Sequence, residues 1–375
     1  MAPSAYPFNS STAVTGYQVD FYRLANKDLK WENQKQFNLG LDLSFLNNRI
    51  LFNADYYKKN NQNLLMDLQL APSSPYNYKT INVAAMSTKG FEFRIKADVI
   101  KTQNFTWQSE FNFSTYKSQV TKLLAGVDSL RPNLKVGEAP NSLIIDYVYD
   151  GIYQISDSVA ARAAGALPGS VRIKDLNGDG KYNMYDMTTI GRTTPKGWGG
   201  FWNYWNYKGF GLTVFANYMF GHSIFNKAWQ DYQYSNGRRL LMKEGMNFWT
   251  EKITDARGNV IVEENTNTNI PRPNAFGKAV KTLPGGTSSF AVQKGDFIKV
   301  RNITLSYDFS KTLIDKAKLR SLTLYVQFLD PFTITKYTGV DPEISQLPSG
   351  GSWSGASYDI YPRYKTTLIG VKVGL

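Results

Sequence analysis

Apolar and polar residues alternate along several segments of this chain, which is the period of a β-strand with two different faces. The alternation begins at residues 38–45 and is strictest at residues 91–99. In the second segment four charged side chains share the face opposite the aromatic and aliphatic ones: Glu92, Arg94, Lys96 and Asp98. Such a row of charges cannot be buried in an ordinary core. It is typical of an exposed sheet face or of the wet interior of a wide barrel.

Short and long connections alternate between the predicted strands. The short joins lie near residues 47, 102, 208 and 315, and the long joins near 70, 155, 260 and 345. The first long join, at residues 58–86, is predicted to be irregular because it contains a Pro-Ser-Ser-Pro sequence. Outer-membrane barrels have short periplasmic turns, long extracellular loops and strands of ~10 residues. The lengths therefore predict an all-β fold, an antiparallel transmembrane β-barrel segment of about ten strands.

Composition narrows the alternatives. Cysteine is absent, which excludes disulfides and thiolate chemistry. The net charge of +13 comes from basic residues that are scattered rather than clustered. It argues against nucleic acid as a partner and fits anionic surroundings such as an outer leaflet. No stretch approaches the ~20 apolar residues of a spanning helix, so a membrane protein of this composition has to be a barrel. A soluble all-β domain is the alternative fold.

Residues 175–186 carry oxygen ligands at the spacing of a calcium-binding loop, inside a long outer loop predicted at residues 121–195. Gly180 stands where such loops turn sharply, and Asp186 replaces the glutamate usual at the last position, which predicts weaker binding. The sequence predicts a structural Ca²⁺ that stiffens the outer loop, with a solvated Asn/Gly turn as the alternative. The expected ligands, one of them a main-chain carbonyl, are Asp175, Asn177, Asp179, Lys181 (carbonyl), Asn183 and Asp186.

Other candidate chemistry is sparse. His222 is the single histidine, and a lone histidine does not make a zinc site. No nucleophile elbow, dinucleotide fingerprint or Walker A pattern occurs, so no catalytic residue is predicted. Aromatic residues in the long connections are the candidates for contact with a ligand or partner: Trp229, Tyr232, Tyr234, Trp249 and Trp353.

A second aromatic group occupies the segment 198–207. Its rings are candidates for a platform that stacks on sugars, but aromatics near strand ends more often form the interface girdle of a barrel. The girdle is therefore the favoured interpretation. The members of the group are Trp198, Phe201, Trp202, Tyr204, Trp205 and Tyr207.

Seven stretches, spread in order over nearly the whole chain, carry a family resemblance: residues 27–57, 89–100, 149–154, 174–186, 206–226, 296–311 and 336–345. They include the sequences KGFEFRIKADVI, KDLNGDGKYNMYD and DFIKVRNITLSYDFSK. Together they resemble the C-terminal part of the SusC/RagA-type TonB-linked outer-membrane proteins. Each stretch alone is a weak signal, whereas their shared order is specific.

The resemblance implies a barrel of about 22 strands that imports large nutrients such as oligosaccharides or peptides. It also implies a SusD-like surface lipoprotein as a lid and a TonB complex that supplies energy through an N-terminal part. The chain shows no signal peptide, TonB box or plug and ends in Leu375 rather than an aromatic residue. Residues 1–375 are therefore expected to be the C-terminal barrel portion of an outer-membrane nutrient transporter, not an enzyme. A soluble calcium-dependent carbohydrate-binding or adhesive protein is the alternative.

Overall fold

A computed structural model describes residues 2–7, 13–18, 22–124, 126–131, 134–226, 247–272, 288–316, 318–343 and 363–374. The chain divides into two compact units. The first unit contains residues 1–39, 56–90 and 117–140, and the second contains residues 40–55, 91–116 and 141–375. Each unit therefore combines segments that are separate in the sequence, and most of the boundaries fall within long strands.

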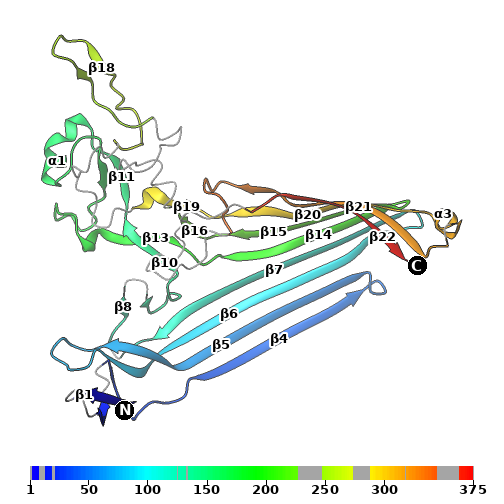
Figure 1. Cartoon of the computed structure of the whole chain (residues 1–375), viewed down its shortest axis with the longest axis horizontal. Helices are drawn as coiled ribbons and strands as arrows, with labels where there is room; N and C mark the ends of the chain where they lie inside the picture. Colours follow the sequence, from blue (N-terminus) through cyan, green and yellow to red (C-terminus); the bar gives the residue numbers. More distant parts are fainter. Residues whose placement is uncertain are drawn as a thin grey trace. The chain divides into compact units, whose positions relative to one another are not determined.

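The main sheet is antiparallel along its whole path, which runs β22-β21-β20-β15-β14-β7-β6-β5-β4 (Figure 1). A two-residue strand, β3, pairs in parallel with β6 at the side of this path. The bounds are β3 Arg23–Leu24, β4 Asn33–Phe45, β5 Ile50–Gln69, β6 Tyr78–Lys101, β7 Phe105–Lys122, β14 Gly197–Tyr207, β15 Phe210–Phe220, β20 Phe297–Asp308, β21 Ser321–Thr335 and β22 Thr366–Gly374. The predicted antiparallel all-β fold of about ten strands is confirmed.

The remaining strands form two-stranded sheets outside the main sheet, and the described helices are short. They are β1 Ala2–Pro7, β2 Ala13–Gln18, β8 Ser129–Arg131, β9 Leu134–Lys135, β10 Leu143–Tyr147, β11 Tyr149–Ile152, η1 Ile155–Asp157, α1 Ser158–Ala163, β12 Val171–Ile173, η2 Met184–Asp186, β13 Met187–Arg192, β16 Ser223–Phe225, β17 Ile253–Thr254, β18 Val260–Val262, η5 Ser289–Ala291, β19 Val292–Lys294 and α3 Lys311–Lys316. Among the described helices, none is long and apolar enough to cross a membrane.

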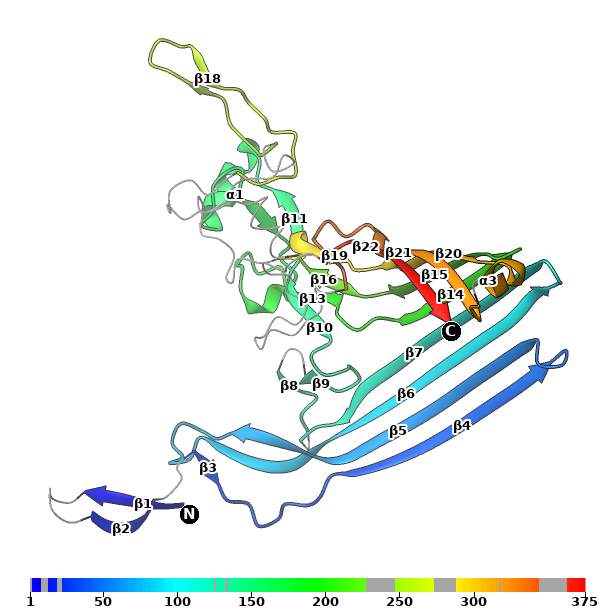
Figure 2. The same cartoon turned by 45° about the vertical axis from the view of Figure 1, so that its right-hand side comes forward.

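The predicted short joins near residues 47, 102 and 208 are tight turns in the structure, whereas the join near residue 315 contains a helix. Lys208 and Gly209 connect β14 to β15, and both have positive φ (48° and 92°), as the two central residues of a type I′ hairpin turn require. Leu46, Asn47 and Asn48 also have positive φ between β4 and β5. The join between β20 and β21 contains α3, which lies at the end of these two strands (Figure 2).

The expectation of irregular structure at residues 58–86 is wrong. β5 continues to Gln69 and β6 starts at Tyr78, so the connection consists of residues 70–77 only. The Pro-Ser-Ser-Pro sequence makes the turn itself, where the Ser74 N–H donates to the Ala71 carbonyl at 2.8 Å. Backbone pairing needs no apolar side chains, so two strands can continue through a stretch of mixed polarity that breaks the alternation used to find them.

The two faces of the sheet in the second unit are sharply different. Strand register aligns one row across six strands on the first face: Trp107, Trp205, Leu212, Leu305, Val326 and Ile369. The neighbouring row on the other face is mostly polar: Gln108, Tyr204, Thr213, Thr304, Gln327 and Leu368. Strand register therefore aligns apolar residues with apolar residues and polar with polar across neighbouring strands, so the alternation within each strand gives the sheet two different faces.

Large apolar side chains of the first face are exposed rather than packed against a second sheet. Examples from five neighbouring strands are Phe201, Phe210, Leu305, Leu324 and Ile369. A contiguous apolar surface of this extent marks a site of contact with a membrane or another protein. On the opposite face, charged and amide groups hold each other: the Arg94 guanidinium contacts both Glu110 oxygens at 2.7 and 2.8 Å. The sheet therefore has one polar face and one apolar face.

Candidate functional site

The loop at residues 175–186 is held by its own acidic side chains. The two carboxylate oxygens of Asp175 accept the Gly178 and Gly180 N–H groups at 2.7 and 2.8 Å, and Asp179 accepts the Lys181 N–H at 2.8 Å. Glycines at positions 178 and 180 have positive φ, which allows the chain to turn around the Asp175 carboxylate. This hydrogen-bonded loop brings the predicted ligands at positions 175, 177 and 179 onto one short, exposed turn.

Two of the predicted ligands, Asp179 and Asp186, have different surroundings. The Lys181 N–H and then the Asn177 amide donate to Asp179, and both lower the pKa of this exposed carboxyl group below its usual value. Asp186 differs from the other predicted ligands because it is fully buried and its oxygens accept the Leu176 and Asn183 N–H groups, both at 2.9 Å. Within the described residues, no three His, Cys, Asp or Glu side chains converge as a metal cluster. The Ca²⁺ site stays a prediction.

Of the five aromatic residues predicted to contact a ligand, the structure describes only Trp249. Four of them lie outside the described residues: Trp229, Tyr232, Tyr234 and Trp353. The fifth, Trp249, is only 1% exposed, and its indole N–H donates to the Gln154 side chain at 3.1 Å. The Arg272 guanidinium lies over the same ring, 5.8 Å from its centre. This burial gives Trp249 a packing role and does not favour direct ligand contact.

The aromatic group at residues 198–207 splits between the two faces of β14. Because side chains alternate along a strand, Phe201, Trp205 and Tyr207 lie on the apolar face. Trp205 stacks there on Trp107 with 6.4 Å between ring centres. Trp202 and Tyr204 lie on the polar face and stack on each other at 6.2 Å. The favoured girdle therefore fits only the first set, while the second lines the polar face, where a ligand can reach it.

A network of ion pairs on the polar face was not found from the sequence. The Lys299 ammonium, 4% exposed, lies 2.6 Å from Asp341 and 3.5 Å from Glu343. Arg301 contacts Glu343 and also Asp330, the latter at 3.0 Å. Asp330 belongs to β21, whereas Asp341 and Glu343 follow it, so these pairs join β20 both to β21 and to the segment after β21. The partners are 29 to 44 residues apart in sequence. No local spacing signal could have paired them.

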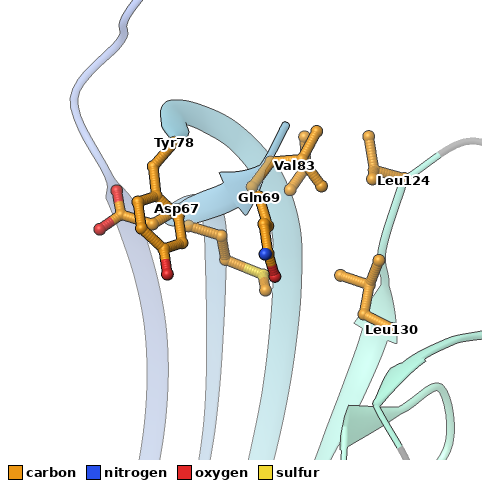
Figure 3. A pocket seen from close by; sticks show the side chains of 8 residues that line it. Asp67, Gln69, Tyr78, Val83, Leu124 and Leu130 are labelled. Atoms are coloured by element: carbon orange, nitrogen blue, oxygen red, sulfur yellow. The ribbon is translucent and has the colours of Figure 1, made fainter. Parts of the chain in front are cut away.

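A cavity of about 400 Å³ lies in the first unit, at the ends of β5 and β6 (Figure 3). Val83 and Gln69 face Leu124 and Leu130 across it. On the strand side, the Asp67 carboxylate accepts hydrogen bonds from Arg23 and Thr80, both at 2.6 Å. The remaining lining residues are Met66, Leu68 and Tyr78. Most of its lining side chains are apolar, and the sequence carries no motif that singles it out.

His222 is buried just past the end of β15, and neither ring nitrogen has a hydrogen-bond partner among the described residues. Burial lowers the pKa of His222, and the nearby Asp296 raises it by a smaller amount. A β-carbon at Gly295 would lie 2.1 Å from the Nε2 atom, so the ring fills the space that this glycine leaves. The structure thus gives the single histidine a buried, packed environment rather than that of a polar loop residue.

Comparison with known proteins agrees with the fold. The family model described as "TonB dependent receptor-like, beta-barrel" matches residues 1–327. The chain is 30% identical to TonB-dependent receptor P3 of Formosa agariphila, over 98% of this chain and 37% of that protein. It is 26% identical to TonB-dependent receptor SusC of Bacteroides thetaiotaomicron, over 98% of this chain and 34% of that protein. This chain therefore spans about a third of the length of these curated relatives.

Solved structures show the same fold. The RagAB peptide importer in its "open-open" state aligns with a TM-score of 0.75 and 21% identity, covering 100% of this chain and 38% of that chain. Another structure of the RagAB peptide transporter aligns with a TM-score of 0.71 and 19% identity, with the same coverage. The sheet with one apolar and one polar face is thus part of a β-barrel wall.

The chain belongs to the TonB-dependent receptor β-barrel family and is of the SusC/RagA type. The resemblance seen in the sequence is confirmed. Family membership does not support the alternative of a soluble calcium-dependent adhesive or carbohydrate-binding protein.

Proposed function

We propose that this chain forms the C-terminal wall of an outer-membrane receptor that imports oligosaccharides or peptides. The observation that supports this most is the pair of opposite rows across β7, β14, β15, β20, β21 and β22. The exposed apolar row suits acyl chains, and the polar row suits a water-filled lumen. Trp202 and Tyr204 of the polar face offer stacking surfaces to a passing substrate. The substrate binds and moves without covalent chemistry.

Two partners belong to the proposal. SusC and RagAB, the named relatives, support a SusD-like surface lipoprotein that closes the barrel from outside. The family name supports a TonB complex that supplies energy through an N-terminal part of the receptor. The long connections that follow β7, β15 and β21 all leave the same end of the sheet, which is the end where we place the lipoprotein.

Deletion of the complete open reading frame that contains these residues tests the function. We expect the deletion strain to lose uptake of one substrate class, either labelled oligosaccharides or labelled peptides, and complementation to restore it. Outer-membrane fractions of the complemented strain should contain the receptor. Recovery of the receptor only in soluble fractions, or unchanged uptake of both classes, would contradict the proposal.

We also propose that residues 175–186 bind Ca²⁺ as a structural ion of the connection between β7 and β14. The support is the short turn that carries Asp175, Asn177 and Asp179, in which the side-chain oxygens of these residues converge through their hydrogen bonds to the loop backbone. The ion would add no chemical step; it would cross-link oxygen atoms of one loop. The buried Asp186 would contribute through its place in the loop's own hydrogen bonds.

The substitution Asp179→Asn should weaken Ca²⁺ binding by roughly tenfold, because it removes one charge while keeping an oxygen acceptor for the Lys181 N–H. Isothermal titration of the purified receptor measures the effect. Asp255→Asn is the matched control, since Asp255 is an exposed carboxylate that accepts the Arg257 and Asn259 N–H groups in a similar turn. Equal Ca²⁺ binding by wild type and Asp179→Asn, or an equal loss in the control, would contradict the proposed site.

A further inference from the structure

A groove of about 500 Å³ opens where β15 ends, β20 begins and β21 ends. Register places these three strand ends side by side, because Met219 pairs with Phe297 and Phe297 pairs with Thr335. The groove therefore lies at the end of the sheet that carries the long connections. No residue of the calcium loop, the ion-pair network or the first-unit cavity lines it.

The walls of the groove continue the apolar face of the sheet. Phe220, Ile298 and Ile334 line it and are 40%, 49% and 60% exposed. Tyr218, also on this face, donates its hydroxyl to the Asn112 carbonyl at 2.9 Å, which leaves the flat ring as part of the wall. Register places Ile298 opposite both Tyr218 and Ile334, so the wall crosses three strands without a polar break.

Two cations stand at one end of this apolar wall. Lys294 ends β19, Lys336 directly follows β21, and both are exposed. Neither ammonium forms an ion pair with a carboxylate in the part of the chain that the structure describes. Asp296 is the acidic group of the lining, and its Oδ1 atom accepts the Gly221 N–H at 2.7 Å. The groove thus has an apolar body and a cationic edge.

We propose that this groove binds an anionic, phosphate-bearing lipid of the leaflet at the long-connection end. One acyl chain would lie along Phe220, Ile298 and Ile334, and the phosphate would lie between the ammonium groups of Lys294 and Lys336. An amphiphile with a single charged end matches this arrangement, whereas a soluble anion would gain nothing from the apolar wall. The inference rests on the proposed membrane location of the receptor.

Lipid retention by the complete receptor tests the proposal. The receptor is reconstituted in nanodiscs of phosphatidylcholine mixed with diphosphoryl lipid A, extracted in mild detergent and examined by native mass spectrometry. We expect wild type to retain lipid A and the double variant Lys294→Gln/Lys336→Gln to retain on the order of tenfold less. Ile334→Ser, which shortens the apolar wall and keeps both charges, should also reduce retention. Lys311→Gln/Lys316→Gln is the control, with the same charge change in the exposed α3 connection.

The outcomes distinguish failure of the proposed lipid site from failure of the proposed transport function. Equal retention by wild type and Lys294→Gln/Lys336→Gln, in receptor that still imports substrate, would overturn the lipid site and leave the transporter intact. An equal loss in the α3 control would also overturn it, because the effect would then be net charge alone. Failure of the wild-type receptor to enter bilayers would overturn the membrane location itself. Retention of a polypeptide in place of lipid A would show that the groove serves a protein partner.

Discussion

Replacing Asp341 with alanine is expected to destabilise the folded receptor by about 3–5 kcal/mol, the usual cost of leaving a buried charge without its partner. Lys299 is 4% exposed, and the Asp341 carboxylate lies 2.6 Å from its ammonium group. Glu343 is farther from Lys299, at 3.5 Å, and already contacts Arg301, so it can offset only part of the loss. Denaturant unfolding of the receptor in lipid bilayers measures the change.

The double variant Lys299→Met/Asp341→Leu distinguishes two contributions to the free energy of unfolding. One is the loss caused by an unpaired buried charge, and the other is the net stabilisation by the intact ion pair. Replacement of a buried ion pair by apolar groups of similar size is often neutral. We therefore expect the double variant to recover most of the stability that Asp341→Ala loses. A single variant within about 1 kcal/mol of wild type would show that water or a neighbouring carboxylate satisfies Lys299, and would remove the energetic argument for this network.

Asp341→Ala should also affect transport, because the ion-pair network joins the polar face of β20 to the long connection that follows β21. Asp341 and Glu343 lie just past the end of β21, and Lys299 and Arg301 lie on β20. Loss of Asp341 would release the start of the connection that leads to β22. Uptake by cells that display normal amounts of folded receptor should therefore fall for Asp341→Ala and be restored in part by Asp341→Glu, which keeps the charge.

Alternation in the sequence predicted most strands of the main sheet and the tight turns of its hairpins. It works because one face of each strand is consistently apolar, as at Phe91, Phe93 and Ile95 of β6. It failed at residues 58–86, where strands continue with mixed polarity on both faces. Periodicity reports the surroundings of a strand, so it loses its signal where both faces meet similar surroundings.

The candidate sites were less predictable than the fold, for two physical reasons. The loop at residues 175–186 could be singled out because its spacing of oxygen ligands is local. The burial of Asp186 was not predictable, because that side chain accepts the Leu176 and Asn183 N–H groups. The ion-pair network and the lipid groove join segments that are distant in sequence, such as Lys294 and Lys336. Sites of this kind depend on strand register, which the pattern of a single strand does not contain.

The sheet also contains close tyrosine–glycine pairs, which give the second large prediction. A β-carbon at Gly90 of β6 would lie 2.3 Å from the Tyr57 ring of β5, and one at Gly370 of β22 would lie 2.4 Å from the Tyr325 ring of β21. In both pairs the ring lies against a glycine of the neighbouring strand, where no side chain is in its way. This arrangement fixes register, because a shift of either strand would place the ring against a β-carbon.

Gly90→Ala should therefore destabilise the sheet by about 1–3 kcal/mol, the range for atoms forced into a packed site, and should slow assembly. Gly40→Ala on β4 is the matched control, since its β-carbon would meet only the end of the flexible Asp55 side chain, at 2.9 Å. The mobility of folded and heated receptor on gels measures the folded fraction.

Tyr57→Ala/Gly90→Ala should recover part of the lost stability, because the double variant removes the overlap between the ring and the new β-carbon. Equal folding of Gly90→Ala and Gly40→Ala would show that the Tyr57 ring moves aside freely and that this pair does not set the register of β5 and β6.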